Sequence, residues 1–128
     1  MENEFVNYEV ALKLNELGLN EPCFATYQYP SKILVRVDAD SEGVKNSNFV
    51  NFITAPLYQQ VFRWFREKYD LDSYIKPATL KTKRVYDYHI WFINEKEESD
   101  LFIGMNNEYS YEEAELACLN KLIEIVKQ

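Results

Sequence analysis

The stretch RVYDYHIWFI, residues 84–93, is rich in β-branched and aromatic residues and has the length of a β-strand. Successive side chains of a strand point to opposite faces of the sheet, so every second residue shares a face. One face then carries four apolar or aromatic side chains, those of Tyr86, Tyr88, Ile90 and Phe92. We expect this row to belong to the core, because a sheet persists only when one of its faces is buried.

The segments that flank residues 84–93 predict a hairpin. A polar turn at Asn94–Asp100 leads into a second strand at Leu101–Met105. Before the long run, Ser73–Lys76 is a short candidate for a third strand.

A second hairpin is predicted nearer the N-terminus. The runs Cys23–Tyr29 and Ile33–Asp38 are separated by the turn residues Pro30-Ser31-Lys32. In the second run apolar residues recur at Ile33 and every second position after it, which is the period of a strand.

Two helices are predicted on either side of the N-terminal hairpin. The first spans Tyr8–Leu17, with Asn7 as its N-cap and Gly18 as the residue that ends it. The second is predicted to open at Thr54, whose hydroxyl suits an N-cap, and to run to about Tyr69.

A third helix is predicted at the C-terminus. Ser110 and Glu113 have the spacing of a capping box, in which each residue satisfies a backbone N–H of the other. Tyr109 against Ala114 would add a hydrophobic staple, and the helix should reach the last residues.

The predicted order is helix, hairpin, helix, a candidate single strand, hairpin and helix. Hairpins rather than crossovers join the strands, which favours antiparallel pairing. We therefore expect an α+β fold in which an antiparallel sheet of four to five strands carries three helices mainly on one face. A chain of 128 residues has the length of one domain, so residues 1–128 are expected to form a single globular domain.

The composition is that of a folded, acidic protein. A hydrophobic content of 47% with 10 Tyr, 8 Phe and only 3 Gly excludes the disordered and collagen-like classes. The net charge of −7 repels nucleic-acid phosphates and anionic membranes at long range. The opening MENEFVNYEV lacks the features of a signal peptide, and no segment approaches 18 consecutive apolar residues. We expect a cytoplasmic protein without membrane contact.

Reactive groups are sparse in this sequence. Asp87 and His89 share one face of the predicted strand and would make a candidate acid–base pair, but no activated nucleophile accompanies them. Cys23 and Cys118 are far apart, so no metal-ligand pair forms locally. The acidic turn at residues 38–43 resembles the start of a calcium loop but lacks the glutamate required at the twelfth position. We expect no catalytic residues, no cofactor and no metal, and hence no enzyme; a small hydrolase that uses Asp87 and His89 is the least favoured alternative.

One segment has the composition of a nucleic-acid contact. Basic residues lead into the aromatic strand, a combination that single-stranded nucleic acids exploit through phosphate contacts and base stacking. The candidates are Lys76, Lys81, Lys83, Arg84 and Tyr86. The alternative is that the strand aromatics are core and the lysines an ordinary polar linker, and the net charge also disfavours a nucleic-acid partner.

The second predicted helix carries more apolar surface than one buried stripe requires. Its two apolar rows need two neighbours, which are either both internal or include another protein, since interfaces concentrate aromatic residues and arginine. The candidate interaction residues are Tyr58, Arg63, Trp64 and Arg66. The partner expected from this pattern is a protein, and the oligomeric state leaves no trace in the sequence.

Three segments resemble a group of small bacterial and phage proteins. They are FVNYEVALKLNELGLNEPCFATY (5–27), APLYQQVFRWFREKYDL (55–71) and YSYEEAELACLNKLIEIVKQ (109–128). In these segments the chain resembles uncharacterised proteins encoded by phages, prophages and other mobile elements of Bacteroides-type gut bacteria. The resemblance implies a bacterial or phage-infected cytoplasm, and no activity or site residue follows from it. We expect a non-enzymatic protein–protein interaction module.

Overall fold

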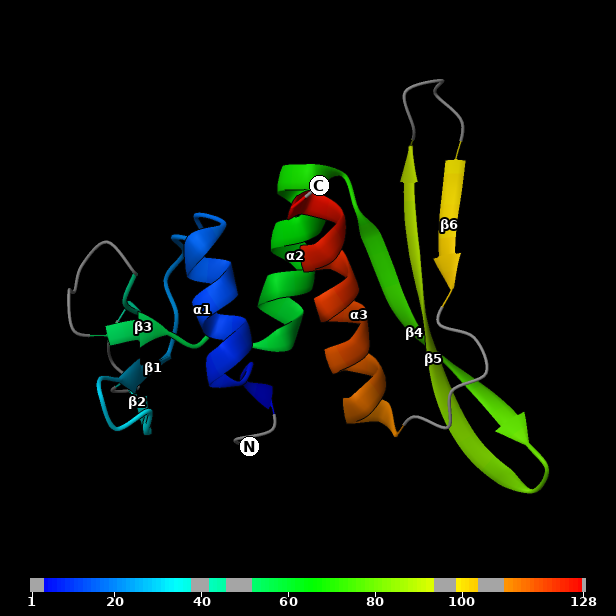
Figure 1. The fold of residues 1–128 in the computed structure, drawn as a ribbon, viewed down its shortest axis with the longest axis horizontal. Coiled ribbons are helices and arrows are strands. Elements are labelled where there is room, and N and C mark those ends of the chain that lie inside the picture. Colours follow the sequence, from blue (N-terminus) through cyan, green and yellow to red (C-terminus); the bar gives the residue numbers. More distant parts are fainter. Residues whose placement is uncertain (1–3, 38–41, 46–51, 94–98, 104–109, 128) are drawn as a thin grey trace. The chain divides into compact units, whose positions relative to one another are not determined.

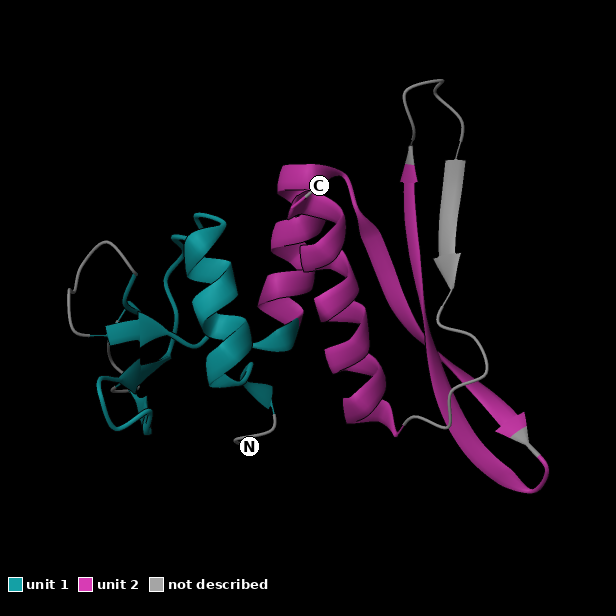
Figure 2. Cartoon of the chain, viewed as in Figure 1, with its two compact units in different colours: residues 1–58 teal, residues 59–128 magenta. Residues whose placement is uncertain are grey.

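The computed structural model describes residues 4–37, 42–45, 52–93, 99–103 and 110–127. The chain divides into two compact units, residues 1–58 and 59–128, which Figure 2 shows in different colours. Each unit has its own three-stranded antiparallel sheet.

The first unit combines one helix with short strands (Figure 1). Helix α1 (Tyr8–Glu16) precedes β1 (Ala25–Gln28), β2 (Leu34–Arg36) and β3 (Phe52–Thr54). The strand order is β2-β1-β3, and α1 contacts β3. The central strand β1 therefore pairs on both sides, whereas β2 and β3 are edge strands.

One buried cluster of the first unit lies on the face of this sheet that carries Ala25 and Tyr27, while Thr26 and Thr54 are buried on the other face. Phe5, Ala25 and Ala55 form a buried cluster, against which Tyr27 and Leu34 pack. Helix α1 buries Val10, Ala11 and Leu14, which recur at helical spacing on one side of the helix.

The predicted signals for α1 are confirmed. The side chain of Asn7 accepts a hydrogen bond of 2.9 Å from the Val10 N–H, which satisfies one of the unpaired donors of the first turn. Gly18 adopts φ of 93°, a conformation that L-residues rarely take, and lets the Leu19 N–H donate to the Leu14 carbonyl.

The second unit combines two helices with a longer sheet (Figure 1). Helix α2 (Tyr58–Tyr69), which begins at the boundary, leads into β4 (Asp72–Leu80), β5 (Lys83–Ile93) and β6 (Ser99–Ile103), followed by α3 (Tyr111–Lys127). The strand order is β4-β5-β6, and α3 contacts β5 and β4.

The turn from α2 into β4 is tight. Asp70 adopts a φ of 55°, which stops the helix and reverses the chain. The Leu71 N–H then donates to the Phe65 carbonyl at 3.3 Å, and the Leu71 side chain is buried. The connection therefore brings one side of α2 close to the start of β4.

The predicted capping box of α3 is confirmed. The Ser110 N–H donates to Oε1 of Glu113 at 2.9 Å, and the Glu113 N–H donates to Oγ of Ser110 at 3.2 Å. The helix runs to Lys127 and buries Cys118, Leu119 and Leu122. The predicted staple partner Tyr109 lies outside the described residues.

The α+β class, the three helices and the antiparallel hairpins are confirmed. The expectation of a single sheet is wrong, because the six strands of the described residues divide into two sheets of three. The sequence prediction missed β3, a strand of three residues that is too short to show a period; it pairs with β1 and completes a separate N-terminal sheet. Consequently α1 and α3 contact different sheets rather than one common face. A single domain over residues 1–128 remains a prediction.

The predicted start of α2 is also wrong. Thr54 does not cap the helix but ends β3, where it pairs with Thr26 of β1. The helix begins at Tyr58, four residues later, and ends at Tyr69 as predicted. Within the described part of the chain, no helix has both the length and the apolar character needed to cross a membrane.

Candidate binding surfaces

Apolar side chains are exposed in β2 and beside the strands β1 and β2. Ile33 is 58% exposed, Phe24 46% and Val35 36%, all three in the N-terminal hairpin. In the register Thr26 lies opposite Val35, and Tyr27 lies opposite Leu34. Alternation therefore places Ile33 and Val35 on the face opposite Leu34, which packs against the core. We call Phe24, Ile33 and Val35 the edge patch.

The register that exposes the edge patch is fixed by contacts on the other face. The Tyr27 hydroxyl donates to the Val6 carbonyl at 2.7 Å, and the Tyr27 and Tyr8 rings pack edge to face with their centroids 5.7 Å apart. A slip of one residue would turn Tyr27 and Leu34 outward and the edge patch inward. The buried contacts of the core face therefore hold Ile33 and Val35 toward solvent.

The backbone of β2 is paired on one side. The Gln28 N–H donates to the Ile33 carbonyl at 3.1 Å, and the Val37 N–H donates to the Phe24 carbonyl at 2.8 Å. Bonds to a neighbouring strand alternate along an antiparallel strand, so the N–H and C=O groups of Leu34 and Arg36 point away from β1. Among the described residues no strand pairs with that side of β2.

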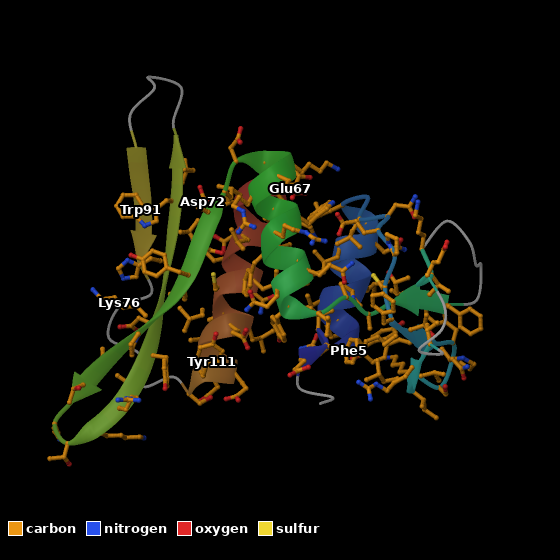
Figure 3. The ribbon with its side chains drawn as sticks, turned by 180° about the vertical axis from the view of Figure 1, so that it is seen from behind. Phe5, Glu67, Asp72, Lys76, Trp91 and Tyr111 are labelled. Atoms are coloured by element: carbon orange, nitrogen blue, oxygen red, sulfur yellow. The ribbon has the colours of Figure 1, made fainter. Side chains whose placement is uncertain are left out.

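The β4–β5 hairpin has an open face of different chemistry. In its register Asp72 lies opposite Trp91, Tyr74 opposite His89, and Lys76 opposite Asp87. Tyr74 is 45% exposed and Trp91 40%. We call the surface formed by Tyr74, Lys76, His89 and Trp91 the hairpin face. Figure 3 shows the side chains of Lys76 and Trp91 on the side of the sheet away from α3.

The opposite face of the same hairpin is the core side. Ile90 is fully buried, and the rings of Tyr86 and of Tyr111 of α3 pack edge to face with their centroids 5.4 Å apart. Ser73 hydrogen-bonds to the Cys118 thiol of α3. Val85 lies on the same face of β5 as His89 and Trp91, but its side chain is buried. The hairpin face is therefore exposed at Tyr74 and Trp91 and not along the whole hairpin.

Four of the five residues predicted for nucleic-acid contact are exposed on the β4–β5 hairpin. Lys81, Lys83 and Arg84 are exposed at the tip of the hairpin, and Lys76 is exposed on the hairpin face. Tyr86 does not join them, because it lies half-buried against Tyr111 on the core side. The exposed aromatic residues on the face of Lys76 are instead Tyr74 and Trp91. Strand alternation could have identified Trp91, because it lies on the face of β5 opposite to the predicted core row.

The predicted interaction residues of α2 separate into two groups. The side chains of Tyr58 and Trp64 are buried, whereas Arg63 and Arg66 are exposed. The Trp64 and Tyr69 ring centroids are 5.5 Å apart, and Nζ of Lys68 lies 5.0 Å from the centroid of the Trp64 ring. Because buried rings offer almost no contact area to a partner, Tyr58 and Trp64 are not part of an exposed interaction surface, and only Arg63 and Arg66 of the predicted set are exposed.

A pocket of about 280 Å³ lies within the second unit. Its lining comes from Gln59, Phe62 and Arg66 of α2, residues 73–75 of β4, and Tyr111 of α3. Burial raises the pKa of the Tyr111 hydroxyl, with the charges of Glu115 and Glu112 adding to the effect. Neither Asp87 nor His89 belongs to this lining.

The cysteines lie in the cores of their units. Burial raises the pKa of the Cys118 thiol to about 12, against the opposing effect of its hydrogen bond with Ser73. Such a thiol is protonated at neutral pH, which is the inert rather than the nucleophilic state. The Cys23 thiol is also buried and donates to the Glu21 carbonyl at 3.3 Å. Within the described residues no three His, Cys, Asp or Glu side chains converge as a metal site would require.

No family model, curated protein or solved structure matches this chain.

Proposed function

We propose that this protein is a non-enzymatic binding module that recognises an extended segment of a partner protein by pairing it with the open side of β2. The observation that carries the proposal is the edge strand itself, whose outward backbone groups lie beside the exposed side chains of Ile33 and Val35. Strand addition of this kind uses backbone hydrogen bonds for affinity and alternate side chains for specificity.

The spacing of the edge patch favours an extended partner. Ile33 and Val35 are two residues apart, so their side chains repeat with the period of a strand. A helical partner would present apolar groups at every third and fourth residue instead. The apolar character of Ile33, Val35 and Phe24 favours a protein with aliphatic or aromatic side chains at alternate positions.

The cellular setting belongs to the same proposal. The resemblance of residues 5–27, 55–71 and 109–128 to proteins of Bacteroides phages and mobile elements supports a role in a bacterial cytoplasm. A binding module suits that setting because a small phage protein can act by occupying a surface of a larger one.

The experiment is a selection of peptides from a display library on the purified protein, followed by calorimetric titration of the selected sequences. We expect peptides with apolar residues at alternate positions, and binding that Ile33→Ser or Val35→Ser weakens about 5- to 30-fold, since each change removes roughly 1–2 kcal/mol of apolar burial. Trp91→Ser is the matched control, because it removes an exposed apolar side chain from the other unit.

The proposal fails if Trp91→Ser weakens the selected peptides as much as Ile33→Ser does. It also fails if no selected peptide distinguishes the wild-type protein from Ile33→Ser. Size-exclusion chromatography with light scattering distinguishes a second copy of the chain as the partner, because Ile33→Ser would then convert a dimer into a monomer.

A further inference from the structure

The tip of the β4–β5 hairpin concentrates positive charge. The segment Lys76–Arg84 contains four basic residues and no acidic one, in a chain whose net charge is −7. Lys76, Lys81, Lys83 and Arg84 are all exposed. At an ionic strength of 0.1 M charges are screened beyond about 10 Å, so the charges near this tip govern a contact there more than the sum over the chain does.

Acidic groups near the hairpin limit this positive charge. Hydrogen bonds from the backbone and side chain of Ser110 lower the pKa of the Glu113 carboxyl, and the nearby charge of Lys83 lowers it further. Lys83 is therefore close to a carboxylate, while Asp87 lies opposite Lys76 on the hairpin face. Arg84 has the parity of Tyr86 and Ile90 on the core side, so Lys76 on the hairpin face and Lys81 in the turn are the two cations best placed for an anionic ligand of that face.

Two exposed rings lie on the same face as Lys76. Tyr74 is opposite His89, and Trp91 is two residues beyond His89, so Tyr74 and Trp91 are diagonal neighbours. Diagonal neighbours in an antiparallel pair have Cα atoms about 7–8 Å apart, within reach of large side chains. The Tyr74 ring is oriented by a 2.9 Å hydrogen bond between its hydroxyl and Nδ1 of His89.

We propose that the hairpin face and its basic tip bind single-stranded nucleic acid. Bases stack on Tyr74 and Trp91, and phosphates contact Lys76 on the same face and Lys81 in the turn. A duplex hides the faces of its bases in its own stack, whereas a single strand presents them to rings on an open sheet. The combination of exposed rings with lysine separates this surface from the apolar edge patch of the other unit.

The test is a fluorescence anisotropy titration with fluorescein-labelled oligothymidylate and oligouridylate, each about 15 nucleotides long. We expect binding at low salt that weakens with a slope of about −1.4 in a plot of log affinity against log salt concentration, as two phosphate contacts to a single strand require. Binding should quench the emission of Trp91, which is exposed, rather than that of Trp64, which is buried.

The variants separate local contacts from total charge. Lys81→Glu and Lys13→Glu change the net charge equally, and both positions are exposed, but Lys13 lies in α1 of the first unit. We expect Lys81→Glu to weaken binding at least 5-fold and Lys13→Glu to leave it within 2-fold. Trp91→Ala should weaken binding about 5- to 150-fold, which is the range measured for loss of one stacked base.

Absence of binding at low salt overturns the proposal, as does an equal effect of Lys13→Glu and Lys81→Glu. Binding of a peptide that depends on Trp91, with no response to either oligonucleotide, would assign the hairpin face to a protein partner and overturn it as well. Ile33→Ser should not change oligonucleotide binding, so failure here is distinguishable from failure of the proposed recognition at β2.

Discussion

Tyr74 and His89 face each other across β4 and β5, with the tyrosine hydroxyl 2.9 Å from Nδ1 of the histidine and the ring centroids 4.9 Å apart. The two rings are tilted by 38° to each other and lie on the exposed side of the sheet. The pair stabilises the register of the hairpin on the exposed face, opposite to the face that packs against α3.

Removal of the Tyr74 hydroxyl should separate the hydrogen bond from the ring contact. We expect Tyr74→Phe to lower the free energy of unfolding by about 0.5–1 kcal/mol, since one exposed hydrogen bond is lost and the ring remains. Tyr74→Ala, which loses both, should cost more. Urea denaturation of the two variants checks this, and an equal cost for both would contradict a contribution from the ring.

The different exposure of two isoleucines, one in each unit, predicts different costs of truncation. Ile90→Ala removes a fully buried side chain and should lower the free energy of unfolding by about 2–5 kcal/mol. Ile33→Ala alters a side chain that is 58% exposed and should change it by less than about 0.5 kcal/mol. Chemical denaturation measures both, and a large cost at Ile33 would show that the edge patch is covered.

The capping box of α3 should contribute to stability through two hydrogen bonds. We expect Ser110→Ala to lower the free energy of unfolding by about 1 kcal/mol, because the Glu113 N–H loses its acceptor. Ser110→Asp, which restores an acceptor at the N-cap, should recover most of that loss. Failure of aspartate to recover stability would argue against a capping role for Ser110.

The buried Cys118 thiol makes stability depend on pH in the alkaline range. Its pKa is raised to about 12 in the folded protein from an ordinary value of 9.0. The unfolded chain therefore releases this proton first as pH rises, and stability falls between pH 9 and pH 12. Urea titrations across that interval should show a smaller decline for Cys118→Ala, and an identical decline in both proteins would contradict the shift.

The sequence predicted those elements whose signals are local. The alternation of residues 84–93 predicted β5, and the spacing of Ser110 and Glu113 predicted the start of α3. The strand β3 was missed because Phe52–Thr54 becomes a strand by pairing with β1, which is distant in the sequence. A segment of three residues is too short to show the alternation that predicts a strand. Thr54 was mistaken for an N-cap because a threonine before proline suits a helix start as well as a strand end.

The candidate surfaces were predicted less well than the fold. The apolar period of Ile33 and Val35 indicated a strand but not which face is buried, since that depends on where Phe5 and Tyr27 pack. The two rows of α2 left open whether the second row was external, and burial of Tyr58 and Trp64 depends on packing that the helix sequence alone does not specify. Exposure is a property of the assembled structure.

Recognition at the open side of β2 is tested most directly by amide hydrogen exchange, measured by NMR with and without a selected peptide. The Leu34 and Arg36 N–H groups point away from β1, so strand addition should slow their exchange at least 10-fold, while that of Val35, already directed toward β1, changes little. Equal exchange at Leu34 and Arg36 in the free and peptide-saturated protein would contradict the account.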